Sequence, residues 1–370
     1  MKKYFAVDSF CGAGGLSHGL HAVGFDVISA FDFNEQAIET YKHNVSTRGM
    51  VADAFAIRGR DLLMDLPSGA ELDLFAGGPP CQGFSKQKRG AHHGDARNEL
   101  VLEYARLVRE LQPRFFLLEN VEQLGGKRGR IFVERMQHEL ADYILFPEFF
   151  NSADFGVAQT RSRYVIVGKR TDVDAGYCPP TPTTKVWKTV GEVLSGLPEP
   201  PDDFSEHSSI ANHYRARVTA MNIKRFSYVK QGGGWHDIPN DLRIKCHQTI
   251  NPKSGGWPDV YGRLDPASQA PTITGGFDSF TRGRYGHPFH DRPITPREAA
   301  RLQGFPDYFR FYGTRWDVRH QIGNAVPPPL SMAIGLSILR SLREADGSEE
   351  NLPANANVRA VQSLLPLGVR

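Results

Sequence analysis

The stretch KYFAVDSFCGAGGLS, residues 3–17, joins an apolar run to a glycine-rich turn that opens an amphipathic segment. The run Lys3–Phe10 predicts a buried β-strand, and the segment after the glycines predicts a helix. Glycines at such a turn let the backbone approach a ligand closely, and the helix N-terminus adds a positive dipole end. The stretch therefore predicts the first strand–turn–helix unit of a ligand-binding α/β sheet.

Short apolar runs and helical periodicities alternate through the first 170 residues. The clearest helical pattern places apolar residues at i, i+3 and i+4 spacing between residues 100 and 111. This alternation predicts an α/β fold with a doubly wound, mostly parallel, Rossmann-like sheet. The runs read as strands are Lys3–Phe10, Phe25–Phe31, Leu72–Ala76, Arg114–Leu118 and Arg163–Gly168.

The composition changes after residue 178, where proline and glycine become frequent and long amphipathic helices disappear. We expect a second, smaller, loop-rich domain with short irregular strands, followed by a C-terminal helix that returns to pack against the first strand. The expected boundaries are 1–178 for the first domain, 179–314 for the second, 315–345 for the returning helix and 346–370 for a mobile tail.

The 370 residues carry a formal net charge of +3, which permits a local nucleic-acid-binding patch without arguing for one. The four cysteines are scattered with no C-x-x-C pair, so we expect neither a metal site nor a disulfide framework. No apolar run approaches the ~20 residues that a membrane span needs. We therefore expect a cytoplasmic protein, monomeric and without a membrane partner.

Two acids point to the ligand of the glycine turn. Asp32 ends the second apolar run, 20 residues after Gly12, where an acid can bind ribose hydroxyls, and Asp53 could meet the polar edge of an adenine. The turn reads G-x-G-G and lacks the G-x-G-x-x-G spacing of dinucleotide-binding proteins. S-adenosylmethionine, which has a ribose and an adenine but no phosphate, fits better, although a tight turn with incidental acids would give the same pattern.

Residues 77–85, GGPPCQGFS, place a thiol at the end of another apolar run. Because proline cannot continue a central strand, the strand ends here and Cys81 is presented at its terminus. Glu119 likewise ends a strand, so the carboxyl ends of parallel strands would bring it to the same edge as Cys81 and Asp32. Read alone, Cys81 could be a turn cysteine and Glu119 a helix cap.

Arg161 and Arg163 stand two residues apart at the start of the last apolar run. On an extended chain they would point the same way, towards an anion or a carbonyl oxygen. The alternative is an edge strand blunted by charge.

Six motifs follow one another along the chain: DSFCGAGG (8–15), GPPCQ (78–82), ENV (119–121), QTRSR (159–163), RPITPREAARLQGFP (292–306) and QIGNAVPP (321–328). With this ordered set the chain resembles the cytosine-C5 DNA methyltransferases over almost its full length. The departures are small: DSF replaces the usual DLF at residues 8–10, and Asp32 stands where Glu is frequent.

The resemblance implies a role for each catalytic candidate. Cys81 would add to C6 of a flipped-out cytosine in a specific duplex DNA sequence, so that C5 can attack the methyl group of S-adenosylmethionine. Glu119 would bond N3 and the exocyclic amine, Arg163 would hold O2, and Arg161 would support the site or a nearby phosphate. The implied cofactor-binding residues are Phe10, Gly12, Gly14, Asp32, Phe33, Asp53, Pro80 and Asn324.

The resemblance also assigns the partners. Residues 179–314 would recognise the DNA target, with Arg282, Arg284 and Tyr285 as candidate contacts, and the basic segment 84–98 would close over the double-stranded DNA. A restriction endonuclease acting on the same site is a further expected partner. A tRNA cytosine-C5 methyltransferase is the nearest alternative, and a nicotinamide-dependent oxidoreductase or a non-catalytic DNA-binding relative belong to other classes.

Overall fold

The structure is a computed structural model that describes residues 2–80, 99–127, 129–249 and 257–348. The chain divides into two compact units. Among the described residues, unit 1 comprises 2–155, 162–183 and 325–348, and unit 2 comprises 156–161 and 184–324.

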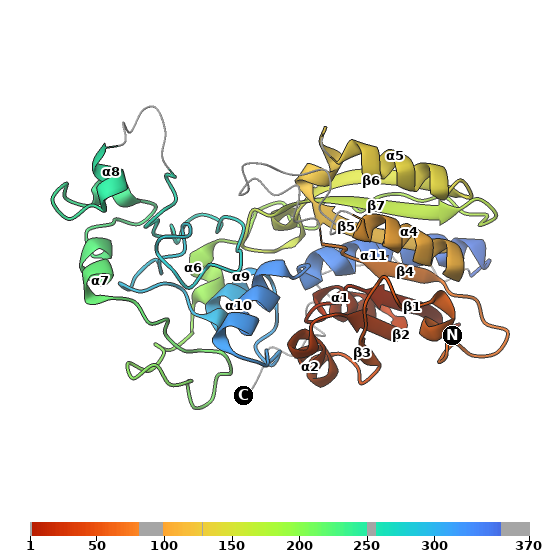
Figure 1. Cartoon of the computed structure of the whole chain (residues 1–370), viewed down its shortest axis with the longest axis horizontal. Coiled ribbons are helices and arrows are strands. Elements are labelled where there is room, and N and C mark those ends of the chain that lie inside the picture. The colour runs from red at the N-terminus through yellow and green to blue at the C-terminus, as the bar shows by residue number, and fades with distance from the viewer. Residues whose placement is uncertain (1, 81–98, 128, 250–256, 349–370) are drawn as a thin grey trace. The chain divides into compact units, whose positions relative to one another are not determined.

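Unit 1 is built on a seven-stranded sheet with the order β3-β2-β1-β4-β5-β7-β6 (Figure 1). The first five strands in this order are parallel, and only β7 runs antiparallel to its neighbours. The predicted doubly wound, mostly parallel α/β fold is confirmed. The strands are β1 Tyr4–Ser9, β2 Phe25–Asp32, β3 Gly49–Val51, β4 Leu74–Gly77, β5 Phe115–Val121, β6 Tyr143–Asn151 and β7 Ser162–Arg170.

Helices cover both faces of this sheet. Val7, Phe75 and Phe116 pack against α4 and α5 on one face, and the predicted apolar side of α4 is buried from Val101 to Leu111. Alternate residues such as Ala6 and Leu74 pack against α1 and α11 on the other face, as the two-residue period of strands requires. The helices are α1 Gly15–Val23, α2 Glu35–Asn44, α3 Gly59–Leu62, α4 Leu100–Leu111, α5 Arg130–Glu139 and α11 Pro328–Ala345.

The C-terminal helix α11 closes unit 1. Ser331 donates a 2.5 Å hydrogen bond from its hydroxyl to the Leu16 carbonyl of α1. A side chain at Gly19 would place its Cβ 2.6 Å from the Pro328 carbonyl oxygen, so glycine permits this close approach. The returning segment is shorter than the expected 315–345, because α10, Arg315–Asn324, clusters with unit 2.

The first residue of the expected tail, Asp346, is held by ion pairs. Asp346 accepts from Lys2 (2.8 Å) and from Arg114 (3.0 Å), and therefore ties the end of α11 to the start of the chain. Residues 349–370 of the expected tail lie outside the described residues.

Unit 2 is loop-rich, as expected, but it is organised by short helices and isolated bridges rather than by strands in its described part. Backbone carbonyls that no sheet satisfies are bonded by buried arginines. Arg297 donates to the carbonyls of Ala211 and Phe309, and Arg263 donates to that of Val229. The helices of this unit are α6 Val190–Leu194, α7 Ala220–Phe226, α8 Lys245–Thr249, α9 Pro296–Leu302 and α10.

Two further expectations concern membranes and cysteines. In the part of the chain that the structure describes, no single helix is long and apolar enough to cross a membrane, and only α10 and α11 taken together pass that test. Cys11, Cys178 and Cys246 are free thiols in the same part of the chain.

Candidate active site

The carboxyl ends of four parallel strands meet along one edge of the sheet. Ser9 at the end of β1 is in register with Phe31 of β2 and with Gly77 of β4, and Gly77 is in register with Leu118 of β5. The residues that follow this row are the glycine turn, Asp32, the segment 78–80 and Glu119. The structure therefore brings the expected cofactor turn and the expected catalytic acid to a common edge, where open α/β sheets bind ligands.

Close packing fixes the end of β4 within this row. A Cβ at Gly77 would lie 2.1 Å from the Ser9 hydroxyl, so a glycine is needed at this position. The buried Tyr104 hydroxyl of α4 lies 3.0 Å from the Phe75 carbonyl and 2.9 Å from the Leu117 carbonyl. These contacts join β4 and β5 just before their site residues and make the edge a rigid support.

The segment that leads to Cys81 is held against Glu119. The Asn120 amide donates a 2.8 Å hydrogen bond to the Pro79 carbonyl, and a Cβ on Gly78 would come within 3.2 Å of the Glu119 carboxylate. The carboxylate thus lies directly beside the backbone of residue 78. Cys81 and the basic segment 84–98 lie outside the described residues.

Glu119 and Arg163 form a buried ion pair. Arg163 Nε lies 2.8 Å from Glu119 Oε1, and each residue is only 9% exposed. Glu119 pairs in register with Val165 and Arg163 with Val121, so the two side chains stand diagonally on one face of β5 and β7. Burial lowers the pKa of the Arg163 guanidinium, and the charge of Glu119 opposes that shift. The pair is a pre-set donor and acceptor at the sheet edge.

Arg161 occupies a different environment from Arg163. It belongs to unit 2, is 2% exposed, and donates to the carbonyls of Ile273 and Gly323 at 3.0 Å each. These hydrogen bonds fasten the segment 156–161 to its own unit. The Arg161 guanidinium donates hydrogen bonds to backbone oxygens. This geometry is compatible with the expected role of Arg161 in supporting the site.

Asp32 organises the glycine turn. Its carboxylate accepts from the backbone N–H of Gly12 (3.0 Å) and from that of Asn34 (2.9 Å). Burial raises the pKa of Asp32, and the N–H groups of Asn34, Gly12 and Phe33 oppose that rise. Gly12 has a φ of 52° and no atom within 4 Å of a built Cβ, so the backbone faces open space there.

The surroundings of Asp32 fit an adenosine group. Phe33 is 72% exposed, which is unusual for a phenylalanine and suits a ring that stacks on a base. Asp53 is exposed two residues beyond β3, whose Val51 is in register with Asp32. Both carboxylates keep acceptor capacity for hydroxyl or amine donors.

The other predicted cofactor residues are distributed between the two units. Phe10 adopts a φ of 54° at the start of the turn, and Gly14 a φ of 97°. Pro80 is half-buried at the last described position before Cys81. Asn324 is exposed at the end of α10 in unit 2, and its role stays a prediction.

Asp8 is a buried acid of β1 that lies within the first sequence motif but had no predicted role. It is fully buried in β1, where one carboxylate oxygen accepts from the Ser17 hydroxyl at 2.6 Å. The other oxygen has no hydrogen-bond partner in the described part of the chain. Burial raises the pKa of Asp8 to about 7. In the sequence, Asp8 could be noticed only as an acid within an apolar strand. A ligand with donor groups would supply a hydrogen bond to the unpaired oxygen.

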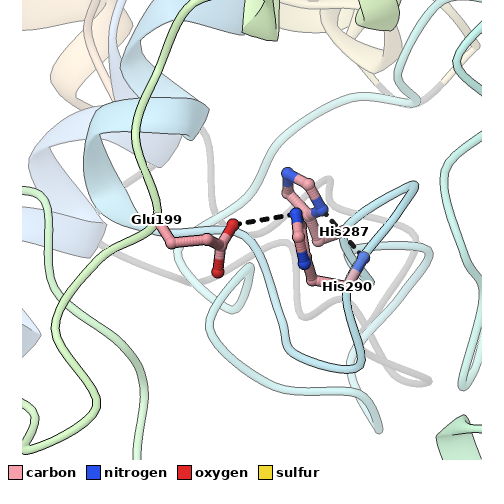
Figure 2. A group of neighbouring side chains, drawn as sticks. All are labelled: Glu199, His287 and His290. Atoms are coloured by element: carbon pink, nitrogen blue, oxygen red, sulfur yellow. Dashed lines mark hydrogen bonds and ion pairs between the residues drawn. The ribbon is translucent and has the colours of Figure 1, made fainter.

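A second polar cluster lies in unit 2 and consists of Glu199, His287 and His290 (Figure 2). One ligand atom from each lies within 4.8 Å of the others, a spacing that could suit a metal ion. However, Arg292 donates to both oxygens of Glu199, and His287 Nδ1 accepts from the N–H groups of Phe289 and His290. The Arg292 guanidinium already bonds this carboxylate together with that of Glu298, so we interpret the cluster as a structural hydrogen-bond network.

Comparisons with known proteins agree with this geometry. Residues 4–340 match the family described as C-5 cytosine-specific DNA methylase. The chain is 33% identical over 344 residues to the Type II methylase M.HgiDII of Herpetosiphon aurantiacus, covering 91% of this chain and 95% of that protein. It is 32% identical over 367 residues to the Type II methyltransferase M.XorII of Xanthomonas oryzae pv. oryzae, with 93% and 86% covered.

A solved structure shows the same fold. It is a DNA modification methyltransferase encoded within a prophage (E. coli), which is 29% identical, has a TM-score of 0.69, and covers 92% of this chain and 100% of that chain. The chain therefore belongs to the C-5 cytosine-specific DNA methylases, a family of enzymes. The resemblance found in the sequence motifs is confirmed, and the oxidoreductase alternative is wrong.

Proposed function

We propose that this enzyme transfers a methyl group from S-adenosylmethionine to C5 of a cytosine in a specific double-stranded DNA sequence. The observation that carries the proposal is the buried Glu119–Arg163 pair, which lies beside the backbone segment leading to Cys81. A carboxylate and a guanidinium at fixed positions can together recognise one edge of a pyrimidine ring.

The chemistry requires a nucleophile because C5 of cytosine is itself a poor one. Addition of the Cys81 thiolate to C6 moves electron density to C5, which then forms a bond to the transferred methyl group. When bound, S-adenosylmethionine would supply that methyl group from its electrophilic sulfonium: the S–CH3 bond would break as the C5–CH3 bond forms, and S-adenosylhomocysteine would leave as a neutral thioether. A base removes the C5 proton, and the Cys81–C6 bond then breaks to release the thiolate and 5-methylcytosine.

Glu119 and Arg163 stabilise the ring while its charge changes. Glu119 accepts from the exocyclic amine and shares a proton with N3, and Arg163 donates to O2. Because the pair is buried and already oriented, little reorganisation is needed as charge develops on the ring. Arg161 acts as a positioning residue that keeps the segment before β7 in place.

Unit 1 would hold the cofactor. Asp32 binds the ribose hydroxyls while it fixes the glycine turn, Phe33 stacks on the adenine, and Asp53 accepts from its amine. Backbone at Phe10, Gly12 and Gly14 borders the cofactor. Pro80 is a further contact from unit 1, and Asn324 is the one predicted cofactor residue that belongs to unit 2.

Unit 2 would recognise the DNA, and the target base would leave the duplex to reach Cys81. Arg284 and Tyr285 fit this role less well than expected. Arg284 donates to the Gly232 carbonyl at 2.7 Å, and the buried Tyr285 hydroxyl donates to the Thr272 carbonyl. Arg282, which is exposed, is still available for a phosphate.

The Type II relatives support a place in a restriction–modification pair, so we propose that a cognate endonuclease shares the target. We also propose that the methyltransferase acts as a cytoplasmic monomer. Bisulfite sequencing of a plasmid from cells expressing the chain tests the function and reveals the target. We expect one short sequence to be methylated completely, and no methylation with Cys81→Ser. Methylation of tRNA with an unmodified plasmid would favour the RNA alternative instead.

A further inference from the structure

Asp8 is the penultimate residue of β1 and stands two residues before the start of the glycine turn. It is fully buried, and its neighbours in register, Ala30 of β2 and Ala76 of β4, have no polar side-chain atoms. The Ser17 hydroxyl donates to one carboxylate oxygen, whereas the other oxygen has no hydrogen-bond partner among the described residues. The fold therefore satisfies only one side of this carboxyl group.

The titratable side chains that interact with Asp8 are acids or neutral groups, and none of them carries a positive charge. They are Asp32 at the end of β2, Cys11 in the glycine turn, Tyr41 of α2 and Tyr104 of α4. Burial raises the pKa of Asp8 to about 7, the hydrogen bonds from Ser17 oppose this rise, and the charge of Asp32 adds to it. A carboxyl group in such surroundings favours its neutral form until a cation arrives.

Two hydroxyl groups connect Asp8 to the glycine turn. The Tyr41 hydroxyl donates a 3.0 Å hydrogen bond to the Ser17 hydroxyl, which in turn donates to Asp8 at 2.6 Å. The Tyr41 ring lies against the turn, because a Cβ at Gly14 would come within 2.9 Å of it. A ligand that borders the turn would therefore lie close to the uncompensated carboxyl group of Asp8.

We propose that Asp8 is the residue by which the enzyme distinguishes the methyl donor, S-adenosylmethionine, from the product, S-adenosylhomocysteine. The two molecules differ by one methyl group and one positive charge, since the sulfonium of the donor becomes a neutral thioether. The inference rests on the cofactor given under the proposed function and deepens it.

The discrimination follows from the coupling of two charges. A sulfonium bound at the turn favours the ionised carboxylate, so the neutral carboxyl group of Asp8 releases its proton to solvent when the donor binds. By reciprocity, the ionised carboxylate favours the donor. The thioether of the product carries no charge, so Asp8 takes up a proton again after methyl transfer and the preference for the bound molecule disappears. Asp8 thus limits inhibition by the product.

The pH dependence of two dissociation constants tests this role. Both constants are measured by isothermal titration calorimetry from pH 5 to pH 8, and their ratio, product over donor, is followed. The ligands share the same adenosine and amino-acid groups, so the titration of other protein groups largely cancels in the ratio. If the bound donor lowers the pKa of Asp8 by about one, the ratio should rise about fivefold between pH 5 and pH 7.

Asp8→Asn keeps the size of the side chain but cannot ionise, so its ratio should not change with pH. Asp73→Asn is the matched control. Asp73 is also a buried acid, but it precedes the amino end of β4, where it accepts from Arg114 and from the N–H of Phe5. This control should keep the wild-type rise. A wild-type ratio that does not change with pH, or a rise that Asp8→Asn retains, would overturn the proposal.

A second variant covers the case in which Asp8→Asn does not fold. Ser17→Ala removes a hydroxyl that favours the ionised carboxylate, so it should raise the pKa of Asp8 and move the rise in the ratio to higher pH. A purely structural role of Asp8 would leave the position of the rise unchanged, and that result would contradict the proposal.

Calorimetry in buffers with different ionisation enthalpies counts the protons directly. At pH 6.5 the wild type should release about half a proton when it binds the donor and almost none when it binds the product. Equal proton counts for the two ligands would contradict the role of Asp8 alone, because the donor would still bind. A chain that binds neither ligand would contradict the proposed function as well.

Discussion

Glu119 and Arg163 stand diagonally across two antiparallel strands, with 2.8 Å between Oε1 and Nε, and nine-tenths of each residue is buried. Removing one member of a buried pair leaves the other uncompensated. The ion pair therefore fixes the position of the Glu119 carboxylate, and losing either partner leaves a buried charge unpaired.

Glu119→Gln should methylate at least about a hundredfold more slowly at saturating substrates, because it removes a charge aimed at the reacting base. Single-turnover transfer of a labelled methyl group measures this, with a thermal melt to confirm folding. Glu134→Gln, on the exposed side of α5, is the matched control and should keep the wild-type rate. An unchanged rate for Glu119→Gln would remove this residue from the mechanism.

Asp32→Asn should weaken S-adenosylmethionine binding by about 10- to 150-fold, since the loss of one charge-assisted acceptor is worth roughly 1.5–3 kcal/mol. The Asp32 carboxylate accepts hydrogen bonds from the N–H groups of Gly12 and Asn34 with its two oxygens. The amide introduced by the substitution offers them only one acceptor oxygen. Isothermal titration calorimetry gives the dissociation constant. The exposed Asp65→Asn provides the control, and equal affinities for the two variants would argue against Asp32 as a cofactor residue.

Asp8 should make stability fall as pH rises. Its pKa is raised from 3.8 to about 7 in the folded chain, so the native state holds the proton more tightly than the unfolded state does. That stabilisation is complete below about pH 4 and is lost as pH rises towards 7.

Asp8→Asn lacks this titration, so its free energy of unfolding relative to wild type should rise by about 2–3 kcal/mol between pH 5 and pH 8. Urea denaturation of both proteins at the two pH values measures the difference, and other titrating groups cancel in the comparison. A difference that does not change with pH would show that Asp8 is ionised normally.

Sequence readout and chemistry should be separable. Exchanging residues 184–290 for the equivalent segment of a relative with a different, known target should move methylation to the donor's sequence, because the described catalytic candidates Glu119 and Arg163 lie in unit 1. Bisulfite sequencing reads the outcome. A folded, active chimera that still modifies the original sequence would place recognition outside the exchanged segment.

Much of unit 1 was predictable because its central strands are continuous apolar runs. Two strands were missed for physical reasons. β3 has only three residues, and β6 is an edge strand whose apolar sequence pattern is interrupted by Pro147 and Glu148. Unit 2 lacks such runs, and its organisation depends on buried arginines such as Arg297 that bond distant carbonyls. No local periodicity indicates those bonds.

The site was predictable to a similar degree. Glu119 and Asp32 were identified because each is a polar residue directly after an apolar strand. The hydrogen bonds of Arg161 to Ile273 and Gly323 come from residues more than 100 positions away, so its sequence spacing from Arg163 could not reveal them.

The proposed mechanism requires a covalent bond between Cys81 and the target base, and a mechanism-based trap tests for this bond directly. In 5-fluorocytosine a fluorine replaces the C5 proton, and a base cannot remove it as it removes a proton. The enzyme should therefore remain attached to a duplex with this base at the methylated position in the presence of S-adenosylmethionine. We predict a stable adduct for wild type and for Cys178→Ser, which removes an exposed cysteine. Mass spectrometry should place the adduct on Cys81, and Cys81→Ser should give none. Full trapping by Cys81→Ser, or an adduct on another residue, would contradict the account.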